Sequence, residues 1–272
     1  MPVKFELKDK MSAFYVNGIQ YKVKPSPIEG DFCHVFLGER MHDGAKSNIC
    51  LKVAMDSSDN ALLQNEAQAL RKLQHQSLPV LIDSFVTSEG KAANVIQRIE
   101  DSYDLYSIRE HFPSGLPQEH AMWVTDRLLS VLGYLHSNDV LHGSIEPGNI
   151  MVTPHNHNGL LIDFTLSLSP PAEKYLGVND YSAPEIEKGA KPSPASDIYS
   201  LGRSMIYLLG GQEANVPSGI DNRFGSFIQG LVRANPNQRK RDAWKALHEL
   251  KSLRNEIYGE SRPFLELKIG GT

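Results

Sequence analysis

Two oxygen-bearing side chains, Asn149 and Asp163, flank a stretch predicted to form a β-hairpin. The apolar segments 149–152 and 160–164 surround the polar, glycine-containing run 153–159, and short β-prone runs separated by turn residues are typical of a hairpin. Asn149 opens the first segment and Asp163 closes the second, so an amide and a carboxylate would meet at one edge. Such hard oxygen ligands suit Mg²⁺ beside phosphates, although Asn and Asp also flank hairpins simply as turn formers.

The composition is typical of a globular protein and does not predict a nucleic-acid or membrane partner. The chain has 272 residues, 40% hydrophobic and 22% charged, which is enough for one substantial core or two smaller lobes. A net charge of −4 gives no sign of a surface for nucleic acid or anionic lipid. Two cysteines, Cys33 and Cys50, make no disulfide framework. The charged start lacks a signal core and no apolar run is long enough to span a bilayer, so we expect a cytoplasmic protein.

Residues 1–100 are predicted to form an antiparallel sheet with one inserted helix. Aromatic and β-branched residues between positions 5 and 23 flank Asn17-Gly18, a dipeptide typical of tight hairpins. The helix is expected near residues 61–73, where leucines recur at helical spacing after the capping candidates Ser57, Ser58 and Asp59. Further strands are expected at residues 28–40, 47–55, 78–85 and 93–99.

Residues 101–272 are predicted to be mostly helical. The composition changes between residues 99 and 104, which is the expected boundary between a small β-rich lobe (1–100) and a larger helical lobe (101–272). The hairpin region, residues 140–167, lies in the second lobe. Helices are expected at residues 120–136, 194–209, 223–234 and 241–258, the second of which stops before Gly210-Gly211.

The sequence around the hairpin resembles two motifs of the protein-kinase superfamily. Residues 142–149, HGSIEPGN, resemble the catalytic loop H-R-D-x-x-x-x-N, and Asp163-Phe164-Thr165 resembles D-F-G. Further landmarks occur at compatible spacing over about residues 20–255: Lys52 in ICLK, Glu66 in the predicted helix, the APE of residues 183–185, and Asp197 in SDIYSLG. By this resemblance, Asp197 would brace the catalytic loop and Arg239 would pair with the A-P-E glutamate, Glu185. The chain therefore resembles a eukaryotic-like Ser/Thr protein kinase. The resemblance implies an α+β, bilobal fold with a small antiparallel β lobe carrying one helix and a larger, mostly helical lobe.

The resemblance also implies ligand roles. Lys52, paired with Glu66, would contact the phosphates of ATP, and Asn149 and Asp163 would hold Mg²⁺. The other implied nucleotide contacts are Gly30 in the glycine-rich loop, Val35, Cys50 and Met151 around adenine, Gln97 at the gatekeeper position and Ile99 in the hinge. Outside this ordered set, a lysine and a glutamate would more simply form a surface ion pair, which contributes little to stability.

The catalytic loop departs from the kinase pattern where the chemistry occurs. Ser144 stands in place of the catalytic Asp, and a hydroxyl is too weak a base at neutral pH; losing a positioned base costs about 10²–10⁴ in rate. Glu146 replaces the lysine that neutralises the transferring phosphoryl group, and Val178 replaces the threonine that links the two. We therefore expect no intact catalytic group among His142, Ser144 and Glu146.

Two neighbouring motifs are degenerate as well. In the glycine-rich loop, residues 28–35, only Gly30 survives, and Asp31 adds a charge that repels phosphate. Gly143 replaces the arginine that reads activation-loop phosphate. Thr165 replaces the D-F-G glycine, which should restrict Phe164 because the backbone freedom of glycine is lost.

The histidines of the predicted hairpin turn could form a metal pair. However, His155 and His157 lie in the run TPHNHNG, which is more simply a solvated turn.

Three hypotheses remain open at this point. The first is a pseudokinase with weak or absent ATP and Mg²⁺ binding that acts on a protein partner as an interaction or allosteric regulatory module. The second is an active, divergent phosphotransferase that uses Glu146 as a substitute base. The third is a nucleotide-independent scaffold. None of them includes a nucleic-acid or membrane partner.

Overall fold

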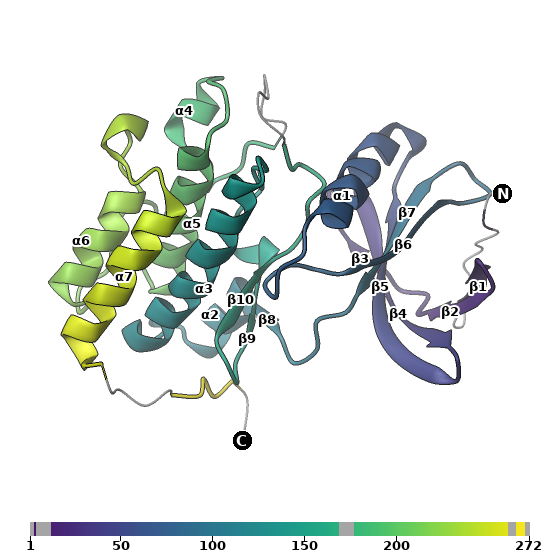
Figure 1. Ribbon diagram of the computed structural model, residues 1–272, viewed down its shortest axis with the longest axis horizontal. Coiled ribbons are helices and arrows are strands. Elements are labelled where there is room, and N and C mark those ends of the chain that lie inside the picture. The colour runs from purple at the N-terminus through teal and green to yellow at the C-terminus, as the bar shows by residue number, and fades with distance from the viewer. Residues whose placement is uncertain (1–2, 4–11, 169–176, 261–264, 270–272) are drawn as a thin grey trace. The chain divides into compact units, whose positions relative to one another are not determined.

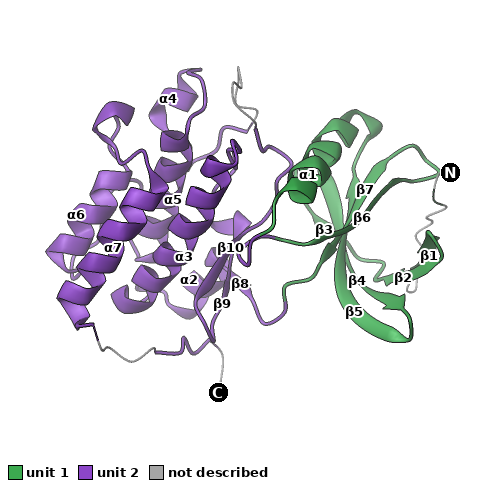
Figure 2. Ribbon diagram, viewed as in Figure 1, with its two compact units in different colours: residues 1–74, 79–99 green, residues 75–78, 100–272 purple. Residues whose placement is uncertain are grey.

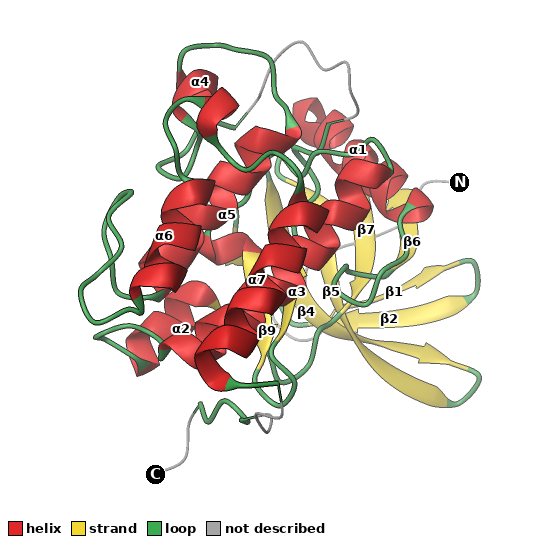
Figure 3. Ribbon diagram, turned by 60° about the vertical axis from the view of Figure 1, so that its left-hand side comes forward, coloured by secondary structure: helices red, strands yellow, loops and turns green. Residues whose placement is uncertain are grey.

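The computed structural model describes residues 3, 12–168, 177–260 and 265–269. The chain divides into two compact units, drawn in separate colours in Figure 2. Unit 1 comprises residues 1–74 and 79–99, and unit 2 comprises residues 75–78 and 100–272. Figure 3 shows that strands dominate unit 1 and helices dominate unit 2, which confirms the predicted α+β class.

Unit 1 is an antiparallel sheet covered by one helix. The sheet order is β1-β2-β4-β5-β7-β6, with β3 paired to β4. The elements are β1 (Ser12–Val16), β2 (Ile19–Val23), β3 (Ile28–Glu29), β4 (Cys33–His42), β5 (Ala45–Ala54), α1 (Asn60–Lys72), β6 (Leu81–Val86) and β7 (Ala92–Gln97). The Asn17-Gly18 hairpin is confirmed, since both residues have positive φ angles, 49° and 82°, as a type I′ turn requires. The predicted strand residues 5–11 lie outside the described residues.

The two faces of this sheet have different partners. One face forms an apolar core that includes Phe14, Tyr21, Phe36, Leu51 and Val95. The other face is covered by α1, which packs against β5, β6 and β7 (Figure 1). Because side chains alternate along a strand, every second residue of β5 and β7 is directed at the helix. Only the residues of β5 and β7 that project from this face can contact side chains of α1.

Unit 2 is a helical assembly with a small three-stranded sheet. The helices are α2 (Leu105–His111), α3 (Gln118–Ser137), α4 (Pro184–Glu187), α5 (Pro194–Leu208), α6 (Asn222–Leu231) and α7 (Ala243–Tyr258). The sheet has the order β10-β9-β8, from β8 (Tyr103–Asp104), β9 (Ile150–Thr153) and β10 (Asn158–Leu161). The long helix α3 packs against α7, α5 and β10. None of the helices in the described ranges is long and apolar enough to cross a bilayer.

The four long helices predicted for this unit are confirmed, with ends shifted by a few residues. The hairpin is confirmed as well, but its boundaries differ from the prediction. β9 begins at Ile150 and β10 already ends at Leu161, so Asn149 and Asp163 lie just outside the strands. Asn149 belongs to the short 3₁₀ turn Pro147–Asn149, and Asp163 has a φ of 63°, which no strand residue adopts.

The prediction that the hairpin turn is solvated is wrong for His157. This ring is fully buried, whereas His155 is exposed. His157 stacks on His120 of α3 with ring centroids 4.8 Å apart, and His157 Nε2 lies 2.6 Å from His120 Nδ1. Burial, with help from His120 and Arg127, lowers the pKa of His157 to about 4. The turn is therefore anchored to α3 through a neutral imidazole.

We expect the stability of the protein to fall between pH 7 and pH 5 because of this histidine. Its folded pKa is lowered, so the unfolded chain, with an ordinary pKa of about 6.5, binds the proton more readily in this range. The loss from His157 should be about 2 kcal/mol in the free energy of unfolding, measured by urea titration at the two pH values. His157→Asn is the matched control, because asparagine tolerates the left-handed backbone, φ 51°, but does not titrate. An unchanged pH dependence in H157N would contradict this assignment.

Candidate functional site

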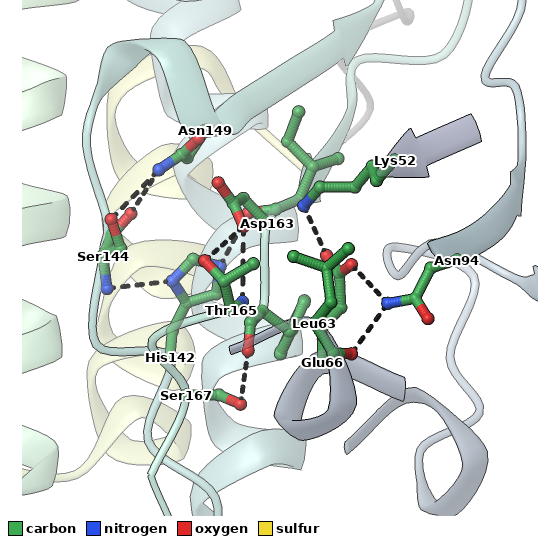
Figure 4. A network of polar contacts seen from close by, with 12 residues as sticks. Lys52, Leu63, Glu66, Asn94, His142, Ser144, Asn149, Asp163, Thr165 and Ser167 are labelled. Atoms are coloured by element: carbon green, nitrogen blue, oxygen red, sulfur yellow. Dashed lines mark hydrogen bonds and ion pairs between the residues drawn. The ribbon is translucent and has the colours of Figure 1, made fainter. Parts of the chain in front are cut away.

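In unit 1, the predicted lysine–glutamate pair exists and is buried. Lys52 Nζ donates to Glu66 Oε1 at 2.7 Å (Figure 4). Lys52 lies on the face of β5 that α1 covers, and Glu66 projects from α1 toward it. The two residues are only 7% and 1% exposed. The alternative reading as an ordinary surface ion pair is therefore wrong.

A third member of this group, Asn94 of β7, was not found from the sequence. Its Nδ2 donates to Glu66 Oε2 at 3.0 Å and to the carbonyl of Leu63 at 2.8 Å (Figure 4). The available signal was the isolated polar residue in the otherwise apolar run AANVI. A buried polar side chain needs a hydrogen-bond partner, and here the partners lie on α1.

The strand register decides which other predicted contacts share this face. Val35 of β4 pairs with Lys52, and Cys50 pairs with Ile96 of β7. Directly paired residues project to the same side of a sheet, so Val35, Cys50 and Ile96 share the face of Lys52.

The gatekeeper assignment to Gln97 is corrected by the same register. Gln97 pairs with Ile49, whose side chain belongs to the core on the opposite face. Ile96 is the residue of β7 that lies beside Cys50, and it is buried. The predicted position was therefore one residue too far along the chain. Ile99 follows β7 and is half-buried.

Gly30 lies in a tight turn between β3 and β4. Its amide donates to the carbonyl of Cys33 at 3.1 Å, and a Cβ at position 30 would lie 2.9 Å from that same oxygen. The turn itself therefore requires glycine here. Ile28, which replaces another glycine of the kinase pattern, is 57% exposed and pairs with Val35.

In unit 2, a buried carboxylate fixes the loop that resembles the catalytic loop. Asp197 of α5 accepts hydrogen bonds from the amides of His142, at 2.9 Å, and Gly143, at 3.2 Å. His136 Nε2 lies 3.0 Å from the same carboxylate. Burial opposes ionisation, but His136 and the charge and amide of His142 hold the pKa of Asp197 below its usual value. The predicted role of Asp197 as a brace is confirmed.

Ser144 occupies the position of the kinase base and is tied to Asn149. Asn149 Nδ2 donates to Ser144 Oγ at 3.1 Å and to the Ser144 carbonyl at 2.9 Å. The Ser144 amide in turn donates to His142 Nδ1 at 3.3 Å (Figure 4). The loop thus keeps an ordered hydrogen-bonded shape without any carboxylate at position 144.

Glu146 contacts the segment that precedes the A-P-E motif. Asn179 Nδ2 donates to Glu146 Oε2 at 2.8 Å. Val178, which replaces the family's threonine, is 58% exposed, and the contact to Glu146 comes from its neighbour Asn179, which belongs to no predicted motif. The charge reversal at position 146 is therefore accommodated by an amide donor next to the missing threonine.

Asp163 is held by the residue that replaces the D-F-G glycine. Thr165 Oγ1 donates to Asp163 Oδ1 at 2.7 Å, and the Thr165 amide lies 3.3 Å from the same oxygen (Figure 4). Phe164 is fully buried and packs edge-on against His142, with centroids 4.7 Å apart. Ser167 Oγ donates to the Phe164 carbonyl at 2.7 Å. Contacts on three successive residues therefore fix this segment.

The donor set of unit 2 fits a magnesium ion bound with phosphates. Asn149 directs its NH₂ group at Ser144, so its carbonyl oxygen is directed elsewhere, and Asp163 offers a carboxylate. Both are hard oxygen donors, as Mg²⁺ prefers, and a nucleotide would supply the remaining oxygens. Across the described residues, no three His, Cys, Asp or Glu side chains gather as a metal-binding cluster. Met151 lies in β9, paired with Asp104 and Leu160.

The A-P-E glutamate forms the predicted ion pair. Arg239 Nη1 donates to Glu185 Oε1 at 2.7 Å, and Nη2 donates to Oε2 at 2.9 Å. Arg239 Nη1 also donates to the carbonyl of Ala195 at 2.7 Å, at the start of α5. This arginine therefore joins α4 to α5 from within the protein.

Comparisons with known proteins agree with this arrangement. The family model described as "Protein kinase domain" matches residues 29–252. The chain is 26% identical over 253 residues to "Serine/threonine-protein kinase TIO" of Arabidopsis thaliana, covering 81% of this chain and 18% of that protein. It is 28% identical over 233 residues to "Serine/threonine-protein kinase PknG" of Mycolicibacterium smegmatis, covering 84% and 29%.

A mouse relative, "Serine/threonine-protein kinase 36", is 25% identical over 246 residues and covers 81% of this chain. The chain spans less than a third of the length of these three relatives, with shares of 18%, 29% and 18%. The family model nevertheless covers most of the chain, and the lysine–glutamate pair, the Asp197 brace and the Glu185–Arg239 pair are all present. The chain belongs to the protein kinase domain family.

Proposed function

We propose that this protein is a pseudokinase, a kinase-fold module that binds ATP and Mg²⁺ weakly and regulates a protein partner without transferring phosphate. The observation that carries the proposal is Ser144 at the position of the kinase base, hydrogen-bonded to Asn149. A neutral hydroxyl in this place cannot take the proton of a substrate hydroxyl at physiological pH. Catalysis by a positioned base is therefore absent.

The surroundings of Glu146 support the same conclusion. A kinase places a cation at this position to stabilise the charge that develops on the transferring phosphoryl group. Here the position holds a carboxylate, and it accepts a hydrogen bond from Asn179. The active alternative requires Glu146 to serve as the base, but its contact with Asn179 gives it a structural role, and its charge repels phosphate.

Nucleotide binding is supported by the residues that remain. Lys52 would contact phosphate oxygens, while Asn149 and Asp163 would hold Mg²⁺, which supplies positive charge between the phosphates when it is bound. The single glycine of the β3–β4 turn and the exposed Ile28 weaken the phosphate-binding loop. The proposed affinity is therefore weak. We further propose a cytoplasmic location and a protein partner, with no role for nucleic acid or membrane.

Thermal unfolding with ATP and Mg²⁺ tests the binding part of the proposal. At about ten times the Kd the free energy of unfolding should rise by about 1.4 kcal/mol, because the ligand binds only the folded state. For a chain of this size that corresponds to an increase of roughly 3 °C in Tm. Asp163→Ala should remove the part of the shift that depends on Mg²⁺. No shift at millimolar ATP in the parent protein would favour the nucleotide-independent scaffold instead.

Transfer of labelled phosphate tests the catalytic part. The parent protein should transfer no label from ATP to protein substrates above the level of D163A. A specific signal that D163A abolishes would overturn the pseudokinase proposal and favour the transferase that uses Glu146.

A further inference from the structure

Asn94 holds the same carboxylate that Lys52 holds, from the neighbouring strand. Glu66 Oε1 accepts from Lys52 Nζ at 2.7 Å, and Glu66 Oε2 accepts from Asn94 Nδ2 at 3.0 Å. The second hydrogen of the Asn94 amide goes to the carbonyl of Leu63, one turn earlier in α1, at 2.8 Å. One uncharged side chain thus binds both the backbone and the functional side chain of the helix (Figure 4).

The sheet register explains why these two donors act together. Asn94 is the direct cross-strand partner of Lys52, so both side chains project from the same rung toward α1. Asn94 and Glu66 are each 1% exposed, so water cannot replace either donor. A buried carboxylate is strongly destabilising without hydrogen-bond donors, and here the two donors approach different oxygens.

We propose that Asn94 is a positioning residue that fixes Glu66 and α1 to the sheet independently of Lys52. When Lys52 turns to another anion, Glu66 keeps a donor and α1 keeps its attachment to β7. The helix is then held in its place by a permanent contact within unit 1. In the proposed function above, that other anion is a nucleotide phosphate, and only this identification rests on the proposed function.

The test uses a substitution that replaces the hydrogen-bond donor at position 94 by an acceptor. Asn94→Asp has nearly the same shape but places a carboxylate against Glu66 and the Leu63 carbonyl. In the folded protein this contact requires a bound proton, so N94D should be strongly destabilised at pH 8 and recover as the pH falls. We expect the gap in urea midpoint between N94D and the parent to narrow from pH 8 to pH 5.5. If N94D is already unfolded at pH 8 without urea, refolding when the pH is lowered to 5.5 supports the proposal in the same way.

Two control variants separate this contact from a general packing effect. Asn94→Leu removes the amide without adding charge, so its gap from the parent should not change with pH. The double variant N94D E66Q restores a donor–acceptor pair with the roles exchanged, and it should be more stable than N94D at pH 8 and lose most of the pH dependence. A pH-independent gap for N94D, or no recovery in N94D E66Q, would overturn the proposal.

A second comparison, made without any nucleotide, tests whether Asn94 can still hold Glu66 when Lys52 is removed, and the reverse. Lys52→Met and Asn94→Leu each remove one of these two donors from Glu66, whereas the double variant removes both. The loss of urea midpoint in K52M N94L should therefore exceed the sum of the two single losses, and additive losses would refute a shared role. No ligand is present in this experiment. Additive losses would therefore refute the role of Asn94 and leave the ATP-binding proposal standing, and a failure of ATP binding would leave the role of Asn94 standing.

Discussion

Arg239→Ala is expected to lower the free energy of unfolding by about 3–5 kcal/mol, because it removes one partner of a buried ion pair. The Arg239 side chain has no exposed surface, and its guanidinium contacts both oxygens of Glu185 and the carbonyl of Ala195. It also lies over the ring of Tyr199, 4.7 Å from the centroid. Truncation leaves a carboxylate and a carbonyl inside the protein without their donor. Urea unfolding measures the loss.

A second arginine in the same unit provides the matched control. Arg223 also contacts both oxygens of a carboxylate, those of Asp221, at 3.0 Å and 2.8 Å, but half of its side chain is exposed, 50% against 0% for Arg239. Water can replace the donor there, so Arg223→Ala should lower the free energy of unfolding far less than Arg239→Ala does. Arg239→Lys keeps the charge but not the planar, two-point contact, so it should fall between the two alanine variants. Equal losses in R239A and R223A would contradict the role of burial.

The long-range braces were predictable from the sequence because their residues belong to motifs with fixed spacing. Glu185 and Arg239 are 54 positions apart, yet the A-P-E spelling and the later arginine identified both partners. Asp197 was identified in the same way as the brace of the catalytic loop, and it accepts hydrogen bonds from the amides of His142 and Gly143. Each of these contacts is determined by the fold itself, so recognising the family was sufficient.

The polar partners Asn94 and Asn179 could not be predicted, because their contacts depend on the local backbone geometry around them. Neither residue belongs to a kinase motif. Whether Asn94 meets Glu66 depends on which face of β7 it occupies, and a shift of one residue would turn it to the opposite side. The same sensitivity explains the wrong assignment of Gln97, whose neighbour Ile96 lies beside Cys50.

The burial of His157 could not be predicted from the sequence, for a different reason. A run of histidine, asparagine and proline is statistically a solvated turn, and its local composition carries no sign of burial. The ring is buried because α3 presents His120 opposite it, 37 positions earlier in the chain. Contacts of this kind follow from tertiary packing. They become visible only when the hairpin and the helix are placed together.

Restoring three residues of the kinase pattern is expected to create phosphotransfer activity. The triple variant S144D E146K V178T supplies the base, the cation and the hydroxyl that the family uses, while Lys52, Glu66, Asn149 and Asp163 are unchanged. A positioned base alone contributes about 10²–10⁴ in rate, so the triple variant should exceed the parent by at least that factor. The measurement is transfer of labelled phosphate from ATP to a generic protein substrate.

The control variant differs from the test variant only at position 144, where an amide takes the place of the carboxylate base. S144N E146K V178T has the same cation, hydroxyl and side-chain size, but an amide cannot accept the proton, so this variant should remain inactive. The lysine at position 146 removes the acceptor of the Asn179 amide, and the adjacent hydroxyl introduced at 178 is expected to offset part of that loss. If both triple variants fold, bind ATP equally and are equally inactive, the catalytic loop does not account for the missing activity. In that case the obstacle lies in residues that the parent shares with both variants, such as Ile28 in the degenerate phosphate loop or Thr165 beside the Asp163 carboxylate.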